Sequence, residues 1–166
     1  MHDAAREWVA KHATTEPVTV LDIGGRDVGG RWGGSVRHMF PNATQYVVLD
    51  IAAGSDVDVV ADAATWEPDR SFDVVVAVEC FEHTHVWPEI CATAMKALRP
   101  GGRLIATMAG PGRAPHGALG AALFGPGEYY ANVAPDDLRH VLENQGWVDI
   151  TVDHTGLDVR AVAAKS

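Results

Sequence analysis

The chain has 166 residues, 47% of them apolar, which suits one domain with a sizeable core but leaves no room for a second folded substrate domain. Its formal net charge of −9 makes nucleic acid an unlikely partner, because that affinity comes from Lys and Arg side chains neutralising phosphates. Neither terminus carries an apolar signal run and no apolar stretch is long enough to span a bilayer, so we expect a cytoplasmic protein with no membrane partner.

Four short apolar runs predict parallel strands that are buried on both faces of a sheet, because they lack clean alternation. Each run delivers a carboxylate toward its carboxyl end: Asp22 in 18–23, Asp50 in 46–50, Asp62 in 57–62 and Glu79 in 72–79. In open α/β sheets, ligands bind outside the carboxyl ends of the strands. The four carboxylates therefore predict one site, for a ligand rich in hydroxyls, amines and amides rather than a bare polyphosphate.

The remaining segments predict helices and a terminal hairpin. We expect helices over 2–13, 35–40, 84–98 and 134–144, a fifth strand over 103–108, and hairpin strands over 147–152 and 157–163. The hairpin would place an antiparallel strand at the sheet edge.

The segment 109–133 is rich in glycine and proline, which predicts a long irregular stretch. Long loops in compact domains are commonly lids or binding loops, and we expect this one to overhang the site. The alternative is a plain surface connector. The segment carries His116, Tyr129 and Tyr130.

A glycine turn follows the first strand. Gly24 and Gly25 let the backbone bend sharply and approach a ligand closely, since a Cβ would obstruct both. Such a turn alone also suits proteins that bind NAD or FAD.

Five stretches in order give a more specific signal: Val20-Leu-Asp-Ile-Gly24, Val48-Leu-Asp-Ile51, Val60-Ala-Asp-Ala63, Phe72-Asp-Val-Val-Val-Ala-Val-Glu-Cys-Phe-Glu-His83 and Leu98-Arg-Pro-Gly-Gly-Arg-Leu-Ile105. Together they resemble the motifs of a class I S-adenosylmethionine-dependent methyltransferase of the methyltransferase type 11 kind. The turn departs from the family pattern, because Gly25-Arg-Asp-Val-Gly-Gly30 stands where x-Gly-x-Gly is usual.

The resemblance implies an α/β fold: a single Rossmann-like domain over 1–166, with a mostly parallel seven-stranded sheet in the order 3-2-1-4-5-7-6 and helices on both faces. It implies S-adenosylmethionine as the cofactor. The residues expected to bind it are Asp22, Gly24, Gly25, Asp50, Ile51, Asp62, Ala63 and Glu79.

Three of these carboxylates have an expected role and an alternative. Asp50 would hold both ribose hydroxyls, or be a solvated loop acid. Asp62 would accept from the adenine amino group, or close an Asx turn. Glu79 would contact the methionine end of the cofactor or the substrate.

The candidate catalytic residues are His83, His85 and Tyr130. His83 and His85 form an i, i+2 imidazole pair near the expected sulfonium, where one of them would act as a general base, although a surface pair of histidines is the favoured interpretation. We expect no metal, because no third ligand is evident at short spacing. Tyr130 could face the cationic sulfonium through its ring or hydroxyl.

The predicted function is methyl transfer to a small or medium acceptor. No Asn/Asp-Pro-Pro-Tyr/Phe motif follows the fourth strand, so methylation of a sugar or metabolite hydroxyl is favoured by elimination. Two alternatives stay open: a non-catalytic cofactor-binding subunit that needs a partner, and a nicotinamide-dependent oxidoreductase. The expected partner is a small-molecule acceptor, and a homodimer is left open.

Overall fold

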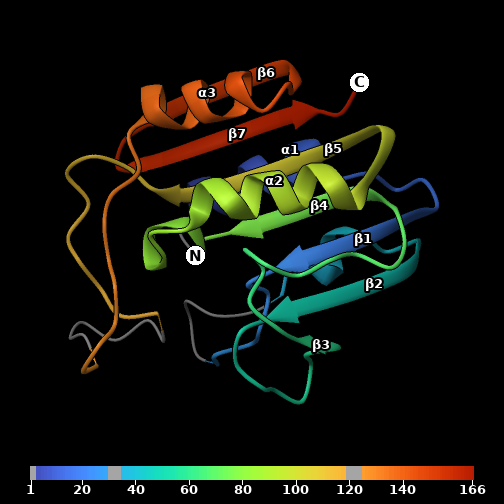
Figure 1. Ribbon diagram of the computed structural model, residues 1–166, viewed down its shortest axis with the longest axis horizontal. Helices are drawn as coiled ribbons and strands as arrows, with labels where there is room; N and C mark the ends of the chain where they lie inside the picture. The colour runs from blue at the N-terminus through green and yellow to red at the C-terminus, as the bar shows by residue number, and fades with distance from the viewer. Residues whose placement is uncertain (1–2, 30–34, 119–124) are drawn as a thin grey trace.

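The computed structural model describes residues 3–29, 35–118 and 125–166, and within these ranges seven strands form one sheet (Figure 1). Their order, β3-β2-β1-β4-β5-β7-β6, confirms the predicted Rossmann-like topology. The strands are β1 (Val18–Ile23), β2 (Ala43–Asp50), β3 (Val59–Val60), β4 (Phe72–Val78), β5 (Leu98–Ala109), β6 (Val148–Thr155) and β7 (Asp158–Ala164).

Strands β1 to β5 are parallel, and β7 pairs antiparallel with both β5 and β6. The terminal hairpin therefore supplies the antiparallel pair at this edge of the sheet. Its turn lies at Gly156 and Leu157, where Gly156 has φ +64°, so β6 continues beyond the predicted end at residue 152 to Thr155, and β7 begins at Asp158.

Helices cover both faces of the sheet. Within the described residues they are α1 (Asp3–His12), α2 (Trp87–Ala97) and α3 (Pro135–Asn144), with 3-10 helices η1 (Arg37–Met39) and η2 (Phe81–His83). Figure 1 shows α2 and α3 in front of the sheet and α1 behind it. None of these helices combines the length and the apolar character that crossing a bilayer requires.

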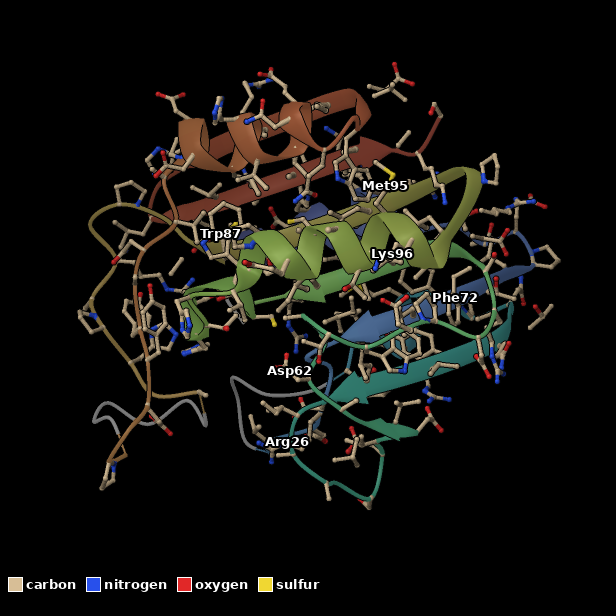
Figure 2. All side chains as sticks on the ribbon, in the orientation of Figure 1. Arg26, Asp62, Phe72, Trp87, Met95 and Lys96 are labelled. Carbon is tan, nitrogen blue, oxygen red and sulfur yellow. The ribbon has the colours of Figure 1, made fainter. Side chains whose placement is uncertain are left out.

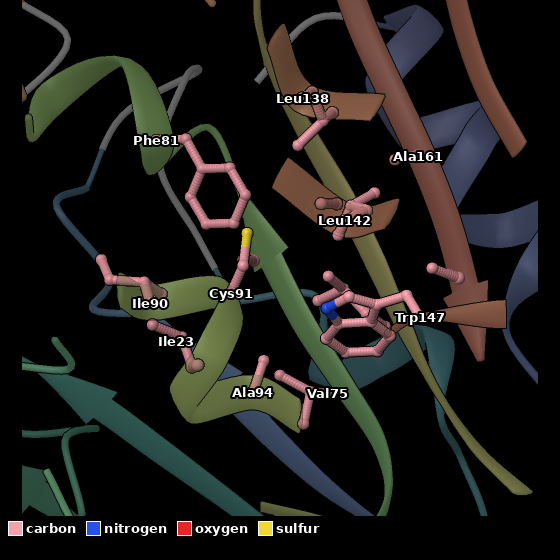
Figure 3. Packing of buried hydrophobic residues seen from close by; sticks show 14 of the residues in the cluster. Ile23, Val75, Phe81, Ile90, Cys91, Ala94, Leu138, Leu142, Trp147 and Ala161 are labelled. Carbon is pink, nitrogen blue, oxygen red and sulfur yellow. The ribbon is translucent and has the colours of Figure 1, made fainter. Parts of the chain in front are cut away.

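The two faces carry separate apolar clusters. Leu21 and Ile23 belong to the cluster under α2 and α3, together with Leu142 and Trp147 (Figure 3). Val20, which directly precedes Leu21, belongs to the cluster under α1. Successive side chains of a strand point to opposite faces of the sheet, so β1 contributes apolar side chains to both clusters.

Several predicted boundaries were wrong. The helix expected over 35–40 is only the turn η1, because the Ser35 hydroxyl accepts the Arg37 N–H and the Phe40 N–H bonds the Arg37 carbonyl. The helix expected from Thr84 begins at Trp87, since Thr84 has extended backbone angles that end η2.

Two strand boundaries also differ. The strand expected over 57–62 is only β3, because an Asp58 carboxylate oxygen bonds the Val48 N–H at 2.9 Å and the chain turns again at Asp62. Strand β5 begins at Leu98, which pairs with Phe72. The residues 1–2, which include the predicted helix start, lie outside the described ranges.

Candidate active site

A cavity of about 600 Å³ opens at the carboxyl ends of β1, β2 and β4. A volume of this size suits a small-molecule site. Figure 2 shows Arg26 and Asp62, which both line it, at this end of the sheet. The lining includes every residue predicted to bind the cofactor: Asp22, Gly24, Gly25, Asp50, Ile51, Asp62, Ala63 and Glu79.

The Asp22 carboxylate lies directly against the glycine turn. It is 2% exposed and accepts hydrogen bonds from the Tyr46 hydroxyl (2.6 Å) and the Ser35 hydroxyl (3.2 Å). Burial raises the pKa of Asp22 to about 6, although the two hydroxyls act to lower it. A Cβ on Gly25 would collide with the Asp22 carboxylate, and Gly24 has φ +72°, so both positions require glycine.

Asp50 is fixed at the cavity wall by its neighbours. Its carboxylate accepts the backbone N–H groups of Arg26 (3.3 Å) and Ala52 (2.9 Å), and it pairs with Arg26 Nε at 3.4 Å. The next residue, Ile51, is 75% exposed and offers an apolar surface to the cavity. The sequence analysis assigned no role to Arg26. In the structure, its backbone N–H and its guanidinium Nε both contact the Asp50 carboxylate.

Asp62 fits both of its interpretations. One carboxylate oxygen accepts the Ala64 N–H at 2.9 Å, as in an Asx turn. The residue also lines the cavity beside Ala63. The turn uses only Oδ1 in that contact, so it is compatible with a ligand contact from the same side chain.

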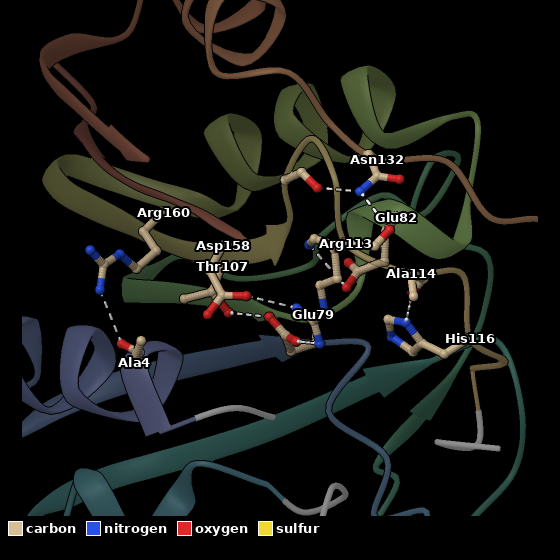
Figure 4. A network of polar contacts seen from close by, with 12 residues as sticks. Ala4, Glu79, Glu82, Thr107, Arg113, Ala114, His116, Asn132, Asp158 and Arg160 are labelled. Atoms are coloured by element: carbon tan, nitrogen blue, oxygen red, sulfur yellow. Dashed lines mark hydrogen bonds and ion pairs between the residues drawn. The ribbon is translucent and has the colours of Figure 1, made fainter. Parts of the chain in front are cut away.

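A buried arginine links two carboxylates at the other end of the cavity (Figure 4). Arg113 lies 2.7 Å from Glu79 Oε2 and 2.9 Å from Asp158 Oδ1, and its side chain is 7% exposed. Glu79 also accepts the Thr107 hydroxyl at 3.2 Å and has φ +54°, a conformation that costs a non-glycine residue about 1 kcal/mol or more. No pattern in the sequence pointed to Arg113, because it lies in the irregular segment.

Glu82 is wholly buried and ties three segments together. One carboxylate oxygen accepts the Ala109 N–H at 3.1 Å, at the end of β5, and its backbone carbonyl accepts the Ala131 N–H at 2.9 Å. Burial, followed by the nearby Glu79 charge, raises the pKa of Glu82 to about 8. The residue therefore closes the irregular segment back onto the sheet.

His83 lines the cavity but His85 does not. The His83 ring makes edge contacts with His116 (5.1 Å between centroids) and Tyr130 (5.7 Å), while His85 packs against Tyr129. Burial is the main reason that the pKa of His83 falls to about 4, so the ring is neutral. His83 and His85 therefore do not form the expected pair, because η2 ends between them. His116 is the imidazole that contacts His83 instead.

Tyr130 lies behind the lining rather than in it. Its ring contacts both His83 and His116, the latter at 4.9 Å between centroids, and burial raises its pKa. Cys80 lines the cavity as a free thiol, and burial raises its pKa to about 12. Cys91 is a free thiol in the core.

Comparison with known proteins identifies the family. Residues 1–152 match the sequence profile of the family described as "Methyltransferase domain". No curated protein sequence matches the chain significantly.

Solved structures share the fold. The DhpI complex with SAH superposes with a TM-score of 0.71 at 19% identity, covering 98% of this chain and 84% of that one. The Burkholderia thailandensis 1,6-didemethyltoxoflavin-N1-methyltransferase, bound to 1,6-didemethyltoxoflavin and S-adenosylhomocysteine, gives 0.68 at 18%, covering 98% and 76%. The Haemonchus contortus phosphoethanolamine N-methyltransferase 2, in complex with S-adenosyl-L-methionine, gives 0.66 at 14%, covering 98% and 52%.

The family match spans most of the chain, and it agrees with the strand order and with a cavity lined by the residues of the motifs. The chain therefore belongs to the methyltransferase domain family and is a class I S-adenosylmethionine-dependent methyltransferase.

Proposed function

We propose that the cavity holds S-adenosylmethionine along the carboxyl ends of β1, β2 and β4. Asp50 accepts hydrogen bonds from the ribose hydroxyls, while Ile51 and Asp62 border the adenine. The turn at Gly24 and Gly25 leaves room for the methionine end. The observation that carries this proposal is that all residues expected for the cofactor from separate motifs line one cavity.

The glycine turn supports the fit of this ligand. The Gly24 N–H donates to the Leu49 carbonyl at 2.8 Å, which brings the end of β1 beside β2. A Cβ at Gly24 would lie 2.7 Å from Cys80 Sγ, so the backbone here is packed as closely as it can be. Glycine at this position therefore lets the Cys80 side chain pack directly against the turn at the cavity wall.

The cofactor supplies an activated methyl group, so the demands on the protein are modest. Its residues need to align the acceptor with the methyl carbon and exclude water. A proton has to leave only where the acceptor is a hydroxyl or a protonated amine. His83, which lines the cavity and is neutral because burial lowers its pKa to about 4, marks the acceptor side.

The proposed acceptor is a small or medium molecule, with the hydroxyl of a sugar or metabolite favoured. The similar structures support the small-molecule part, since one holds 1,6-didemethyltoxoflavin and another is a phosphoethanolamine methyltransferase. The negative charge of the chain supports an acceptor that is not a nucleic acid.

Thermal unfolding with added ligands tests the cofactor. S-adenosylmethionine or S-adenosylhomocysteine at 100 times Kd should stabilise the fold by about 2.7 kcal/mol, while NAD and NADP should leave the melting temperature unchanged. A shift with NAD alone would overturn the proposal. Methylation of a metabolite extract with labelled cofactor then identifies the acceptor.

A further inference from the structure

We propose that Glu82, His83 and His116 form a binding site for a divalent transition-metal ion at the acceptor side of the cavity. One potential ligand atom from each of the three side chains lies within 4.8 Å of the other two. Helix η2 supplies Glu82 and His83 as neighbours, and His116 comes from the irregular segment. The sequence predicted no metal because no third ligand lies at short sequence spacing. In the folded chain, His116 comes from a segment far along the sequence and lies beside Glu82 and His83.

Two atoms of the cluster lack other interactions that would satisfy them. Glu82 Oε2 and His83 Nδ1 are buried without a hydrogen-bond partner in the described part of the chain. Glu82 is wholly buried, so its carboxylate has no access to solvent. Buried polar atoms left unpaired are costly and uncommon, and a bound cation would satisfy both.

The surroundings orient the proposed ligands. The Ala109 N–H bonds one Glu82 oxygen at 3.1 Å, and His116 Nδ1 lies 3.2 Å from the Ala114 carbonyl. Outer contacts of this kind fix ligating carboxylates and the tautomer of ligating imidazoles. The Tyr130 ring packs against both histidines and holds them side by side.

The donor set selects the class of ion. Two imidazoles and one carboxylate suit Mn²⁺, Fe²⁺, Co²⁺ or Zn²⁺, whereas Mg²⁺ and Ca²⁺ prefer oxygen ligands alone. Bonds of about 2.0–2.1 Å would bring the ligand atoms closer together than in this structure, by side-chain shifts on the order of 1 Å. The nearby Arg113 is paired with Glu79 and Asp158, so its positive charge is already offset.

The position suggests what the ion would do. His83 and His116 both line the cavity, so a remaining coordination position can face the acceptor. An acceptor with a ligating oxygen would bind there, and His83 would act as a metal ligand rather than as a base. This consequence rests on the proposed function, while the metal site itself does not.

Calorimetry on the 166-residue chain, stripped with chelator and free of cofactor, tests the site. Mn²⁺ and Zn²⁺ should bind with one ion per chain, and Mg²⁺ should bind more weakly. His116→Ala and Glu82→Gln should each lower the affinity by at least about tenfold, because even outer contacts of metal ligands are worth 10- to 100-fold. Gln retains an oxygen for the Ala109 N–H, so Glu82→Gln keeps that structural contact.

Two histidine variants serve as controls. His140 is exposed on α3, so His140→Ala should bind the ions as the wild type does. His85→Ala should also bind normally, since His85 packs against Tyr129 away from the cluster. Absence of binding by the wild type, or equal affinity in His116→Ala, would overturn the proposal. S-adenosylhomocysteine binding is measured separately by thermal unfolding, so a failed metal site leaves the cofactor assignment standing.

Discussion

The Tyr46 hydroxyl donates a 2.6 Å hydrogen bond to the Asp22 carboxylate in the interior, directly below the glycine turn. Removal from water favours the protonated form of Asp22, and the two hydroxyl donors only partly offset this effect. The contact has opposite effects on the two residues. It lowers the pKa of Asp22, whereas burial and the Asp22 charge raise the pKa of Tyr46. The pKa of the Asp22 carboxyl group therefore lies well above its ordinary value.

Asp22 should make the unliganded protein less stable as pH rises. Its pKa is about 6 in the folded state against 3.8 ordinarily, so the folded protein binds the proton more tightly than the unfolded chain. The Asp22 contribution to the free energy of unfolding therefore falls between pH 4 and 6, by about 3 kcal/mol at about 1.4 kcal/mol per pKa unit. Urea unfolding across this range should show Asp22→Asn gaining stability relative to the wild type as pH rises.

Tyr46→Phe is the matched variant for this effect. It removes a donor to the ionised carboxylate, so the pKa of Asp22 should rise further and the upper limit of the pH window should move upward. A stability difference between Asp22→Asn and wild type that stays constant with pH would contradict the assignment.

Asp50→Ala should weaken cofactor binding by about 1.5–3 kcal/mol, the range for hydrogen bonds to a charged group. Calorimetric titration with S-adenosylhomocysteine measures the loss. Asp69→Ala is the control, because Asp69 is an exposed acid that pairs with its neighbour Arg70. Unchanged affinity in a folded Asp50→Ala protein would remove Asp50 from the ribose contact.

The strand order was implied by the family resemblance, whereas the positions of the carboxylates at the cavity could be predicted because they depend on local signals. A strand that ends in an acid or a glycine turn places that residue at the carboxyl edge, and parallel strands gather these edges into one crevice. Asp50 and Asp62 therefore line the same cavity despite belonging to different motifs.

Contacts made by the irregular segment could not be predicted in this way. Arg113 and His116 have no periodic pattern around them, and their partners Glu79 and His83 lie on other elements. The spacing of His83 and His85 suggested a pair, but Thr84 is extended and ends η2 between them. Only the folded chain determines which imidazole meets His83.

Arg113→Ala should destabilise the fold by about 3–5 kcal/mol, because it removes the cation that offsets the buried Glu79 and Asp158 charges. Arg113→Lys retains one charge and should cost less. Arg70→Ala removes an exposed arginine instead and should leave the stability nearly unchanged. Urea unfolding at neutral pH compares the three, and similar losses for Arg113→Ala and Arg70→Ala would contradict the buried-pair interpretation.

The segment 109–133 is expected to close over the acceptor side. Its ends are joined, since the Val133 N–H donates to the Ala109 carbonyl at 2.9 Å and Asn132 bonds the Gly110 and Arg113 carbonyls. Figure 1 shows the described parts of the segment extending from the end of β5, at the edge where the parallel strands finish. Residues 119–124 lie outside the described ranges.

Hydrogen exchange tests this expectation on 111–118 and 125–131. Protection of these amides should rise when S-adenosylhomocysteine is added, because closure reduces their opening. Equal exchange with and without ligand would identify the segment as a connector.

Tyr130→Phe should lower turnover with little change in melting temperature. The Tyr130 ring packs against His83 and His116, and phenylalanine retains that ring contact while losing the hydroxyl. A tenfold reduction in kcat corresponds to about 1.4 kcal/mol less stabilisation of the transition state. Tyr129→Phe is the control, because Tyr129 is 41% exposed and contacts His85 outside the cavity lining. Rates are measured with the acceptor recovered from the extract screen, and equal kcat values for Tyr130→Phe and the wild type would reduce Tyr130 to a packing residue behind the two histidines.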